Sequence, residues 1–317
     1  MFSTVIQITP SVSKISYQDS IMTLGSCFAQ NIGNKMADVF FDVDINPFGV
    51  LYNPVSIANS IELLLQKKPF IIHDIFEHNS LWQSYSHSSL FSDISVEKCI
   101  DKINSRFIKA VEFFKKTDYM MITFGTAWVF ENKKSGRVVS NCHKLPANNF
   151  VRRRLTVDEI VSEYSLQIIK LQTLFPNLKF IFSVSPIRHW KDGAHENNIS
   201  KSILLLAIDT LQKQFVQVQY FPAYEIMMDE LRDYRFYAPD MLHPSEIAVD
   251  YIWKRFSESY FSEETFKINK QIEQLVADRT HRPLHPDSAE FVLFQNNMNK
   301  RKEDILMRYP FLSNRID

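Results

Sequence analysis

Two nucleophilic side chains, Ser26 and Cys27, stand next to each other directly after Gly25 and a short apolar run. At the start of a helix, a hydroxyl or thiol lies beside backbone N–H groups that have no helical partner. Those groups can stabilise the oxyanion that forms when the nucleophile attacks an acyl carbon. A serine at such a position is also a favoured helix cap. The stretch therefore indicates either acyl-transfer chemistry or a capped helix start.

A general base for this nucleophile is present far along the sequence, where Asp240 and His243 precede a predicted helix. Histidine has a pKa near neutral pH, and a carboxylate bound to its Nδ1 leaves Nε2 free to accept a proton. The alternative is an aspartate cap beside a surface histidine. Adjacent residues of a helix point about 100° apart, so only one of Ser26 and Cys27 faces such a site. A thiol at a helix start competes with the hydroxyl, since its pKa can be lowered there.

The apolar pattern indicates which elements bring these residues together. Short apolar runs predict buried strands at residues 21–24, 118–125, 178–186 and 216–223. Helical periodicity predicts helices at residues 27–40, 54–67, 96–115, 156–175, 198–215 and 245–261. Two β-rich arms at 127–142 predict a hairpin insertion. Strands that alternate with helices predict an α/β fold, a three-layer α/β/α sandwich with a mostly parallel central sheet. Ligands of such sheets bind beyond the carboxyl ends of the strands.

The domain organisation and compartment follow from composition. Residues 1–261 form the predicted α/β domain, and residues 262–317 a helical C-terminal extension packed on it. Lys+Arg and Asp+Glu are equal at 36 each, which argues against sequence-independent nucleic-acid binding. The basic run Arg152 to Arg154 is interpreted as a solvated helix entry. The three cysteines are widely spaced, and no apolar stretch is long enough to span a bilayer. We therefore expect a cytoplasmic protein.

Several segments resemble the GSCFA family, whose name is spelled by residues 25–29. The resemblance runs from about Thr23 to Phe261. It rests on the motifs GSCFA (25–29), NPFG (46–49), GTAW (125–128), NCHK (141–144), SPIRHW (185–190) and DMLH (240–243). The family in turn resembles the SGNH/GDSL hydrolases, three-layer α/β/α esterases and acyltransferases with a flavodoxin-like sheet. The resemblance thus implies ester hydrolysis or acyl transfer and leaves the substrate open.

The resemblance also implies catalytic roles. In SGNH enzymes the nucleophile lies in a Gly-Asp-Ser block after the first strand, and an Asp-x-x-His block closes the site. On this basis we predict Ser26 as the nucleophile, His243 as the base and Asp240 as its partner. Cys27 is then expected to be buried beside the sheet.

The oxyanion hole and the substrate contacts are predicted from the same motifs. SGNH enzymes use the N–H of the nucleophile and the N–H of a glycine, positions that Ser26 and Gly49 match. Their third donor is an asparagine, and this chain offers Thr126 or Asn141 instead. The predicted substrate-binding residues are Asn46, His143, Arg188, His189 and His195.

Cofactor motifs do not occur in the sequence. Neither G-x-G-x-x-G nor G-x-x-x-x-G-K-[ST] is present, and no H-E-x-x-H or cysteine-pair spacing supports a metal. We therefore predict no cofactor. The function predicted is a serine-dependent ester hydrolase or acyltransferase that acts on an acylated small molecule or glycan. The alternative is a non-catalytic or metal-dependent ligand-binding protein on the same fold. The oligomeric state is not predicted.

Overall fold

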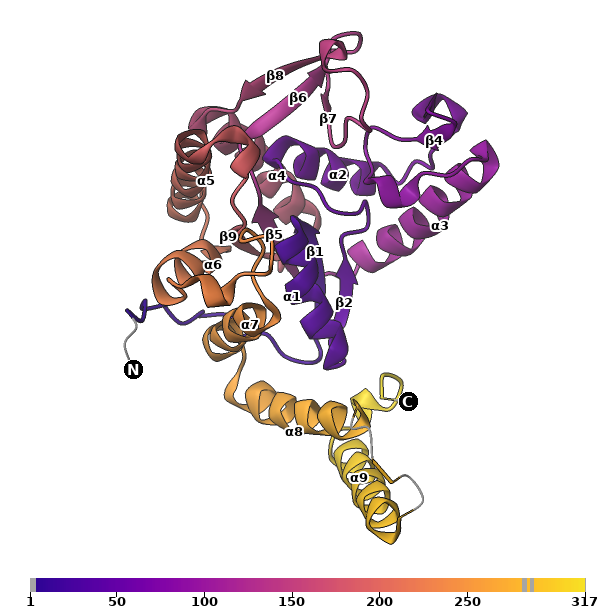
Figure 1. Cartoon of the computed structure of the whole chain (residues 1–317), viewed down its shortest axis with the longest axis vertical. Helices are drawn as coiled ribbons and strands as arrows, with labels where there is room; N and C mark the ends of the chain where they lie inside the picture. Colours follow the sequence, from indigo (N-terminus) through magenta and orange to yellow (C-terminus); the bar gives the residue numbers. More distant parts are fainter. Residues whose placement is uncertain (1–3, 281–283, 286–287, 317) are drawn as a thin grey trace.

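The computed structural model describes residues 4–280, 284–285 and 288–316. Its central feature is a parallel sheet in the order β10-β9-β5-β1-β2 (Figure 1). The strands are β1 (Ser20–Gly25), β2 (Asp42–Ile45), β5 (Tyr119–Phe124), β9 (Lys179–Val184) and β10 (Val218–Tyr220). This is the doubly wound order of flavodoxin-like folds, with β1 next to the switch point. The predicted α/β class and parallel sheet are confirmed.

Helices cover both faces of this sheet. One face packs against α2 (Pro54–Gln66), α3 (Val96–Phe114), α4 (Val157–Leu174) and α5 (Ala194–Gln214). The other face packs against α1 (Cys27–Asp38), α7 (Glu246–Tyr260) and the short α6 (Ala223–Glu225), which continues into the π-helical turn η5 (Ile226–Glu230). The strand side chains alternate between the two cores, as a pleated strand requires. Met22 and Leu24 face the first core, whereas Ile21 faces the second.

The helix start predicted near Thr156 is confirmed by a capping box. The Thr156 hydroxyl accepts the Glu159 N–H at 3.2 Å, and the Glu159 carboxylate accepts the Thr156 N–H at 2.7 Å. Both donors belong to the unpaired N–H groups of a helix start. The cap fixes where α4 begins, directly after the insertion described next.

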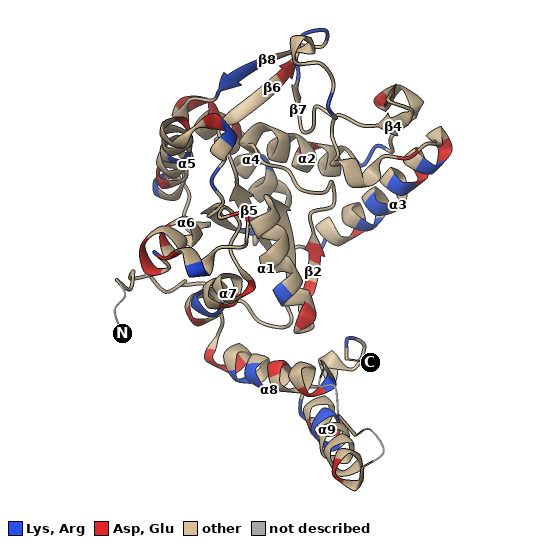
Figure 2. Ribbon diagram, in the orientation of Figure 1, with Lys and Arg blue, Asp and Glu red and all other residues tan. Residues whose placement is uncertain are grey.

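An antiparallel insertion sheet extends from the carboxyl end of β5. It consists of β6 (Trp128–Asn132), β7 (Val138–Val139) and β8 (Phe150–Arg154) in the order β7-β6-β8. The predicted hairpin is thus present, but the basic run Arg152 to Arg154 is part of β8, not a helix entry (Figure 2). A second small hairpin, β3 (Phe76–His78) with β4 (Leu81–Gln83), precedes α3.

The C-terminal segment adds α8 (Glu263–Thr280) and α9 (Ala289–Arg308) below α7 (Figure 1). Buried side chains of this segment, including Ile268, Ile272 and Ile305, join the core on the α1 and α7 side of the sheet. The indole N–H of Trp253 in α7 donates to Glu273 at 3.2 Å. Within the described residues, each helix is too short or too polar to span a bilayer.

The turn from β1 into α1 depends on Gly25. Its φ is +131°, in a region that favours glycine, and a Cβ there would lie 2.2 Å from the Thr123 carbonyl oxygen. The Gly25 N–H donates to Asn46 Oδ1 at 2.9 Å, and the next N–H, of Ser26, donates to the Thr123 carbonyl at 3.2 Å. The chain thus leaves the strand in a single residue, pressed against β5.

We predict that Gly25→Ala destabilises the protein by about 3 kcal/mol or more. The new Cβ forces backbone atoms of β5 to move, and the positive φ is strained for alanine. Gly136→Ala is the matched control, since Gly136 also has a positive φ (+65°) but nothing lies within 4 Å of its virtual Cβ. That variant should lose only about 1 kcal/mol. Urea denaturation of both variants measures the difference. Equal losses would contradict the packing argument.

Candidate active site

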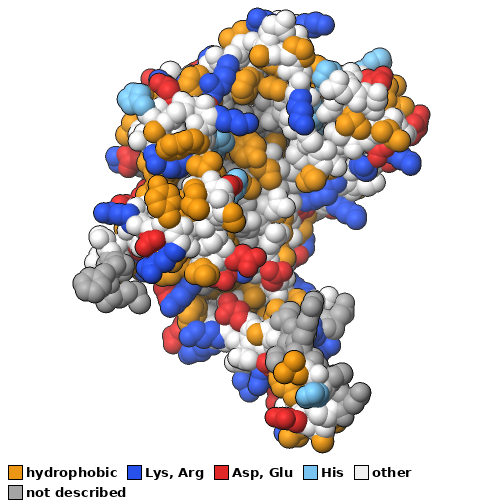
Figure 3. All heavy atoms as spheres, in the orientation of Figure 1, with side chains coloured by type: hydrophobic (Ala, Val, Ile, Leu, Met, Phe, Trp, Pro, Cys, Tyr) orange, Lys and Arg blue, Asp and Glu red, His pale blue; other side chains and the backbone are white. Residues whose placement is uncertain are grey.

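A cleft of about 900 Å³ opens at the carboxyl ends of the strands, beneath the insertion sheet. Hydrophobic side chains gather in this part of the surface (Figure 3). The catalytically relevant side chains that line it are Cys27, Tyr52, Thr126, Asn141, Arg188, His189 and His243. This is the position at which doubly wound sheets bind ligands. The cleft is therefore the candidate active site.

Ser26, the predicted nucleophile, lies outside the cleft. Its side chain is buried, with 1% of the residue exposed, and it does not line the cleft. Its Oγ accepts the Phe28 N–H at 3.2 Å and so serves as the N-cap of α1. Cys27, which we expected beside the sheet, is the first residue of the helix and lines the cleft. The helix cap and the thiol that lines the cleft are thus on two adjacent residues.

The Cys27 thiol lies in a mixed environment. Burial raises its pKa above the ordinary value, whereas the N–H groups of Cys27 and Phe28 and the charge of Lys201 act in the opposite direction. Because burial is the largest effect, the thiol is protonated at neutral pH. A reaction at Cys27 therefore requires a base that removes the proton during attack.

That base is available in the same cleft. The loop before α7 places Asp240 Oδ2 2.5 Å from His243 Nδ1, and Oδ1 accepts the N–H groups of Leu242 and His243, both at 2.9 Å. These two backbone donors, followed by the imidazole, hold the Asp240 pKa at about 2, so the carboxylate is charged. Within the described residues, His243 Nε2 has no hydrogen-bond partner. The pair thus has the orientation that we predicted from the sequence.

Two of the predicted oxyanion donors are already engaged. The Ser26 N–H is bonded to Thr123, and the Gly49 N–H donates to the Asn46 carbonyl at 2.7 Å. Asn141 lines the cleft, and its Nδ2 donates to Ser89 Oγ at 3.2 Å, which leaves its second amide hydrogen.

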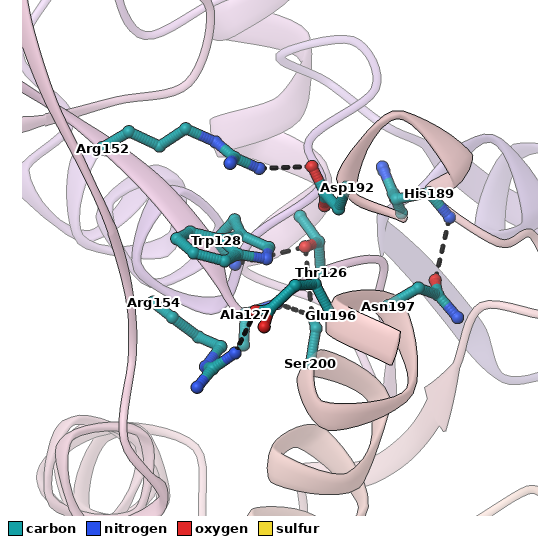
Figure 4. Close-up of polar contacts among 10 residues, drawn as sticks. All are labelled: Thr126, Ala127, Trp128, Arg152, Arg154, His189, Asp192, Glu196, Asn197 and Ser200. Atoms are coloured by element: carbon teal, nitrogen blue, oxygen red, sulfur yellow. Dashed lines mark hydrogen bonds and ion pairs between the residues drawn. The ribbon is translucent and has the colours of Figure 1, made fainter. Parts of the chain in front are cut away.

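Thr126 is the better-placed side-chain donor. Its Oγ1 accepts the Trp128 N–H at 3.1 Å and lies 3.1 Å from Ser200 Oγ, which itself accepts the Ala127 N–H at 2.8 Å. When Ser200 donates its proton to Thr126, the Thr126 hydroxyl hydrogen has no partner in this network (Figure 4). That hydrogen is then available to an oxyanion in the cleft. Cys27, at the start of α1, supplies a backbone N–H with no helical acceptor.

Three predicted substrate-binding residues lie away from the cleft. Asn46 is buried and supports the Gly25 turn through Oδ1. His143 is buried, and its Nε2 bonds the Ser84 carbonyl at 2.7 Å, whereas its neighbour Cys142 lines the cleft. His195 is exposed on the first turn of α5. These three positions are corrected to structural or surface roles.

Two predicted substrate-binding residues do line the cleft. The Arg188 guanidinium donates to Asn198 Oδ1 at 2.7 Å. Burial, with the nearby charge of Lys201, lowers the His189 pKa to about 4, so this imidazole is neutral at neutral pH. Its ring meets the Tyr52 ring edge-on at 5.6 Å. Across the described residues, no group of three or more His, Cys, Asp or Glu side chains converges as a metal site would require.

The insertion sheet forms a wall of the cleft and is tied to the opposite side by ion pairs. Arg152 of β8 pairs with Asp192, and Arg154 pairs with Glu196 at the start of α5 (Figure 4). The Arg152 guanidinium also stacks on the Trp128 ring, 4.1 Å from its centroid. The basic run thus joins two walls of the cleft. No local pattern indicates this role, because the partner acids lie about 40 residues away along the chain.

Lys201 is a buried cation behind the cleft that sequence reasoning missed. Its residue is 2% exposed, and Nζ donates to the Gly125 carbonyl at 2.7 Å and to the Ser185 carbonyl at 2.8 Å. Burial lowers its pKa to about 7, against an opposing attraction from Cys27. A signal was present, since Lys201 falls on the same helical stripe as the buried Leu204 and Ile208.

A family model matches most of the chain. The model of the GSCFA family matches residues 20–256, which span the sheet, Cys27 and the Asp240–His243 pair. The chain belongs to the GSCFA family. No curated protein matches this GSCFA chain.

Solved structures with a distant likeness to the GSCFA chain include two bacterial proteins. One, from Streptococcus pneumoniae, is described as a candidate platelet activating factor; it is 12% identical, with a TM-score of 0.36 over 79% of this chain and 86% of that one. The other, from Bacteroides fragilis, is described as a candidate acylhydrolase; it is 10% identical, with a TM-score of 0.37 over 84% of this chain and 91% of that one.

We predict that Lys201 makes stability rise with pH between about pH 7 and pH 9. Above its folded pKa of about 7 the native amine is neutral, while the unfolded state still binds the proton. The free energy of unfolding therefore rises by up to about 1.4 kcal/mol per pH unit from this group. Lys201→Met should reduce the slope of the free energy of unfolding against pH, even where the substitution also changes the stability at a given pH. Urea denaturation of both proteins across this range measures it, and an unchanged slope would contradict the neutral buried amine.

Proposed function

We propose that this GSCFA protein catalyses ester hydrolysis or acyl transfer through a thioester on Cys27. The observation that carries the proposal is that Cys27 and His243 line one cleft, while Ser26 is buried as a helix cap. The Asp240 carboxylate on Nδ1 leaves His243 Nε2 as the proton acceptor. The proposal thus keeps the acyl chemistry predicted from the sequence and moves it from the hydroxyl to the neighbouring thiol.

Each step uses groups already described. His243 Nε2 takes the thiol proton as Cys27 Sγ attacks the acyl carbon of the ester. The oxyanion accepts hydrogen bonds from the Cys27 N–H and from the Thr126 hydroxyl. When the carbon–oxygen bond to the alcohol breaks, His243 returns the proton to the leaving oxygen. Asp240 fixes the ring tautomer and stabilises the imidazolium between these two transfers.

The lining of the cleft indicates the kind of substrate. The insertion sheet contributes an apolar wall formed by Trp128, Phe130, Val139 and Phe150. Such a wall suits an apolar acyl group, because burial of its methylenes is favourable. The neutral His189, from the segment after β9, also lines the cleft and suits the polar part of the ester. The substrate class proposed is therefore an acylated small molecule or glycan.

We predict that Cys27→Ala abolishes turnover of short p-nitrophenyl esters and the formation of an acyl adduct seen by intact-protein mass spectrometry. Ser26→Ala should keep both and lose only about 1 kcal/mol of stability, the typical value of an N-cap. The opposite outcome would contradict the proposal. If Ser26→Ala folds but forms no adduct, and Cys27→Ala stays active, the Ser26 hydroxyl is the nucleophile.

Cys142→Ser is the matched control for the thiol. Cys142 lines the same cleft, but burial raises its pKa to about 11 and it lies in the loop after β7, not at a helix start like Cys27. This variant should retain turnover and the adduct. If no wild-type adduct forms with any ester, ligand binding without catalysis becomes the better description.

We predict that His243→Gln lowers kcat/KM by about 10²–10⁴, the usual contribution of a general base. Asp240→Asn should also lower it, because the amide keeps an oxygen for the two loop N–H groups yet loses the charge that stabilises the imidazolium. Circular dichroism checks that both variants fold. Full activity of His243→Gln would contradict its role as the base.

A further inference from the structure

A second cavity, of about 510 Å³, adjoins the cleft across the loop that bears the Asp240–His243 pair. Asp240 and Met241 line the second cavity, His243 lines the cleft, and Leu242 lines both. We propose that this cavity binds the acceptor of an acyl transfer, a flat ring that carries a hydroxyl and an anionic group. The inference rests on the proposed thioester at Cys27.

Arg188 and Trp190 also line both cavities, so the two spaces meet at a shared edge. A molecule held in the second cavity therefore lies next to the acyl group in the cleft. Volumes of about 510 Å³ and 900 Å³ each suit a small molecule. Two adjoining spaces beside one base are what a transferase needs and a hydrolase does not.

The Arg188 charge is not neutralised by the protein. Its Nη2 donates to the neutral amide oxygen of Asn198, and its buried Nε has no hydrogen-bond partner. Among the residues that the structure describes, no carboxylate forms an ion pair with it. A half-buried guanidinium whose hydrogen bond goes to a neutral amide is suited to a carboxylate or phosphate, which its terminal nitrogens can bind.

The rest of the cavity suits a flat ring. Exposed side chains at its rim include Trp190 (53%), Tyr234 (74%) and Met241 (51%), and Tyr237 lies deeper. Contiguous exposed aromatic and apolar side chains of this kind mark binding sites. Met241 adopts a φ of +59°, which is strained for a residue with a Cβ, at the tip between Asp240 and His243. Such strain is typical of positions held for function.

The transfer step balances with the groups at hand. The acceptor hydroxyl oxygen attacks the thioester carbonyl carbon and gives its proton to His243 Nε2. The new carbon–oxygen bond forms and the carbon–sulfur bond breaks. The Cys27 thiolate then takes the proton from His243, which restores the starting enzyme.

The test uses the protein with p-nitrophenyl butyrate as donor and flat-ring acceptors that carry or lack an anionic group. 4-(Hydroxymethyl)benzoate is paired with benzyl alcohol, and 4-(hydroxymethyl)phenyl phosphate tests phosphate in place of the carboxylate. Mass spectrometry gives the ratio of butyryl ester product to free butyrate. We expect the ratio to be about tenfold or more higher for the anionic member, the effect of one charged hydrogen bond.

In Arg188→Met, the ratio of ester product to free butyrate for anionic acceptors should fall to the ratio for neutral acceptors. Tyr234→Ala, at an exposed position that tolerates truncation, should lower the ratio for all the ring acceptors. Arg235→Met is the matched control, because Arg235 is 74% exposed in its side chain and lines neither cavity; its ratio should match wild type.

Two results would overturn the acceptor site, provided that the donor is still turned over. One is an equal product ratio for anionic and neutral acceptors, and the other is an Arg188→Met protein that still prefers the anionic acceptor. Absence of p-nitrophenol release and of any acyl adduct would instead remove the proposed thioester, and the acceptor site with it. A preference for 4-(hydroxymethyl)phenyl phosphate over 4-(hydroxymethyl)benzoate would support the anion site and assign it to phosphate.

Discussion

The close approach of Gly25 to β5 is the constraint on which the site depends. A Cβ at this position would lie 2.2 Å from the Thr123 carbonyl oxygen, so only glycine fits here without a shift of the backbone. In this tight turn the Ser26 N–H donates to that carbonyl, and the Ser26 hydroxyl caps α1 by accepting the Phe28 N–H. Cys27 then becomes the first residue of the helix, directed into the cleft. Backbone packing thus places the hydroxyl at the helix cap and the thiol in the cleft.

Lys201 supports the other side of the same site. Its two hydrogen bonds join the Gly125 carbonyl after β5 to the Ser185 carbonyl after β9, so one side chain holds two strand ends together. This link holds the backbone of Ser185 and of Gly125, the residue before Thr126, and so positions Thr126 and Ser185 in the lining of the cleft. The arrangement leaves a titratable amine behind Cys27. Burial opposes charge on both groups, because it raises the pKa of the Cys27 thiol and lowers the pKa of the Lys201 amine to about 7.

The central strands and the long helices could be predicted from the sequence because they are buried on a regular period. The strands at 21–24, 118–125 and 178–186 are continuous apolar runs, as expected when helices cover both faces. The edge strand β2 was missed, since it carries Asp42 and Asp44, and the latter is paired with Arg106 of α3. β8 was missed for the same reason, because its arginines are satisfied by acids from distant segments.

The site was predictable only where its geometry is local. Asp240 and His243 contact each other within one loop, so their spacing carried the information. Ser26 and Cys27 are equally local, but the sequence does not show which one the turn uses as the cap. The structure resolves this point, because the Ser26 Oγ accepts the Phe28 N–H as the cap of α1, whereas Cys27 lines the cleft. Which of the two side chains the cap uses depends on how the Gly25 turn packs against β5, a contact between segments about 100 residues apart in the sequence.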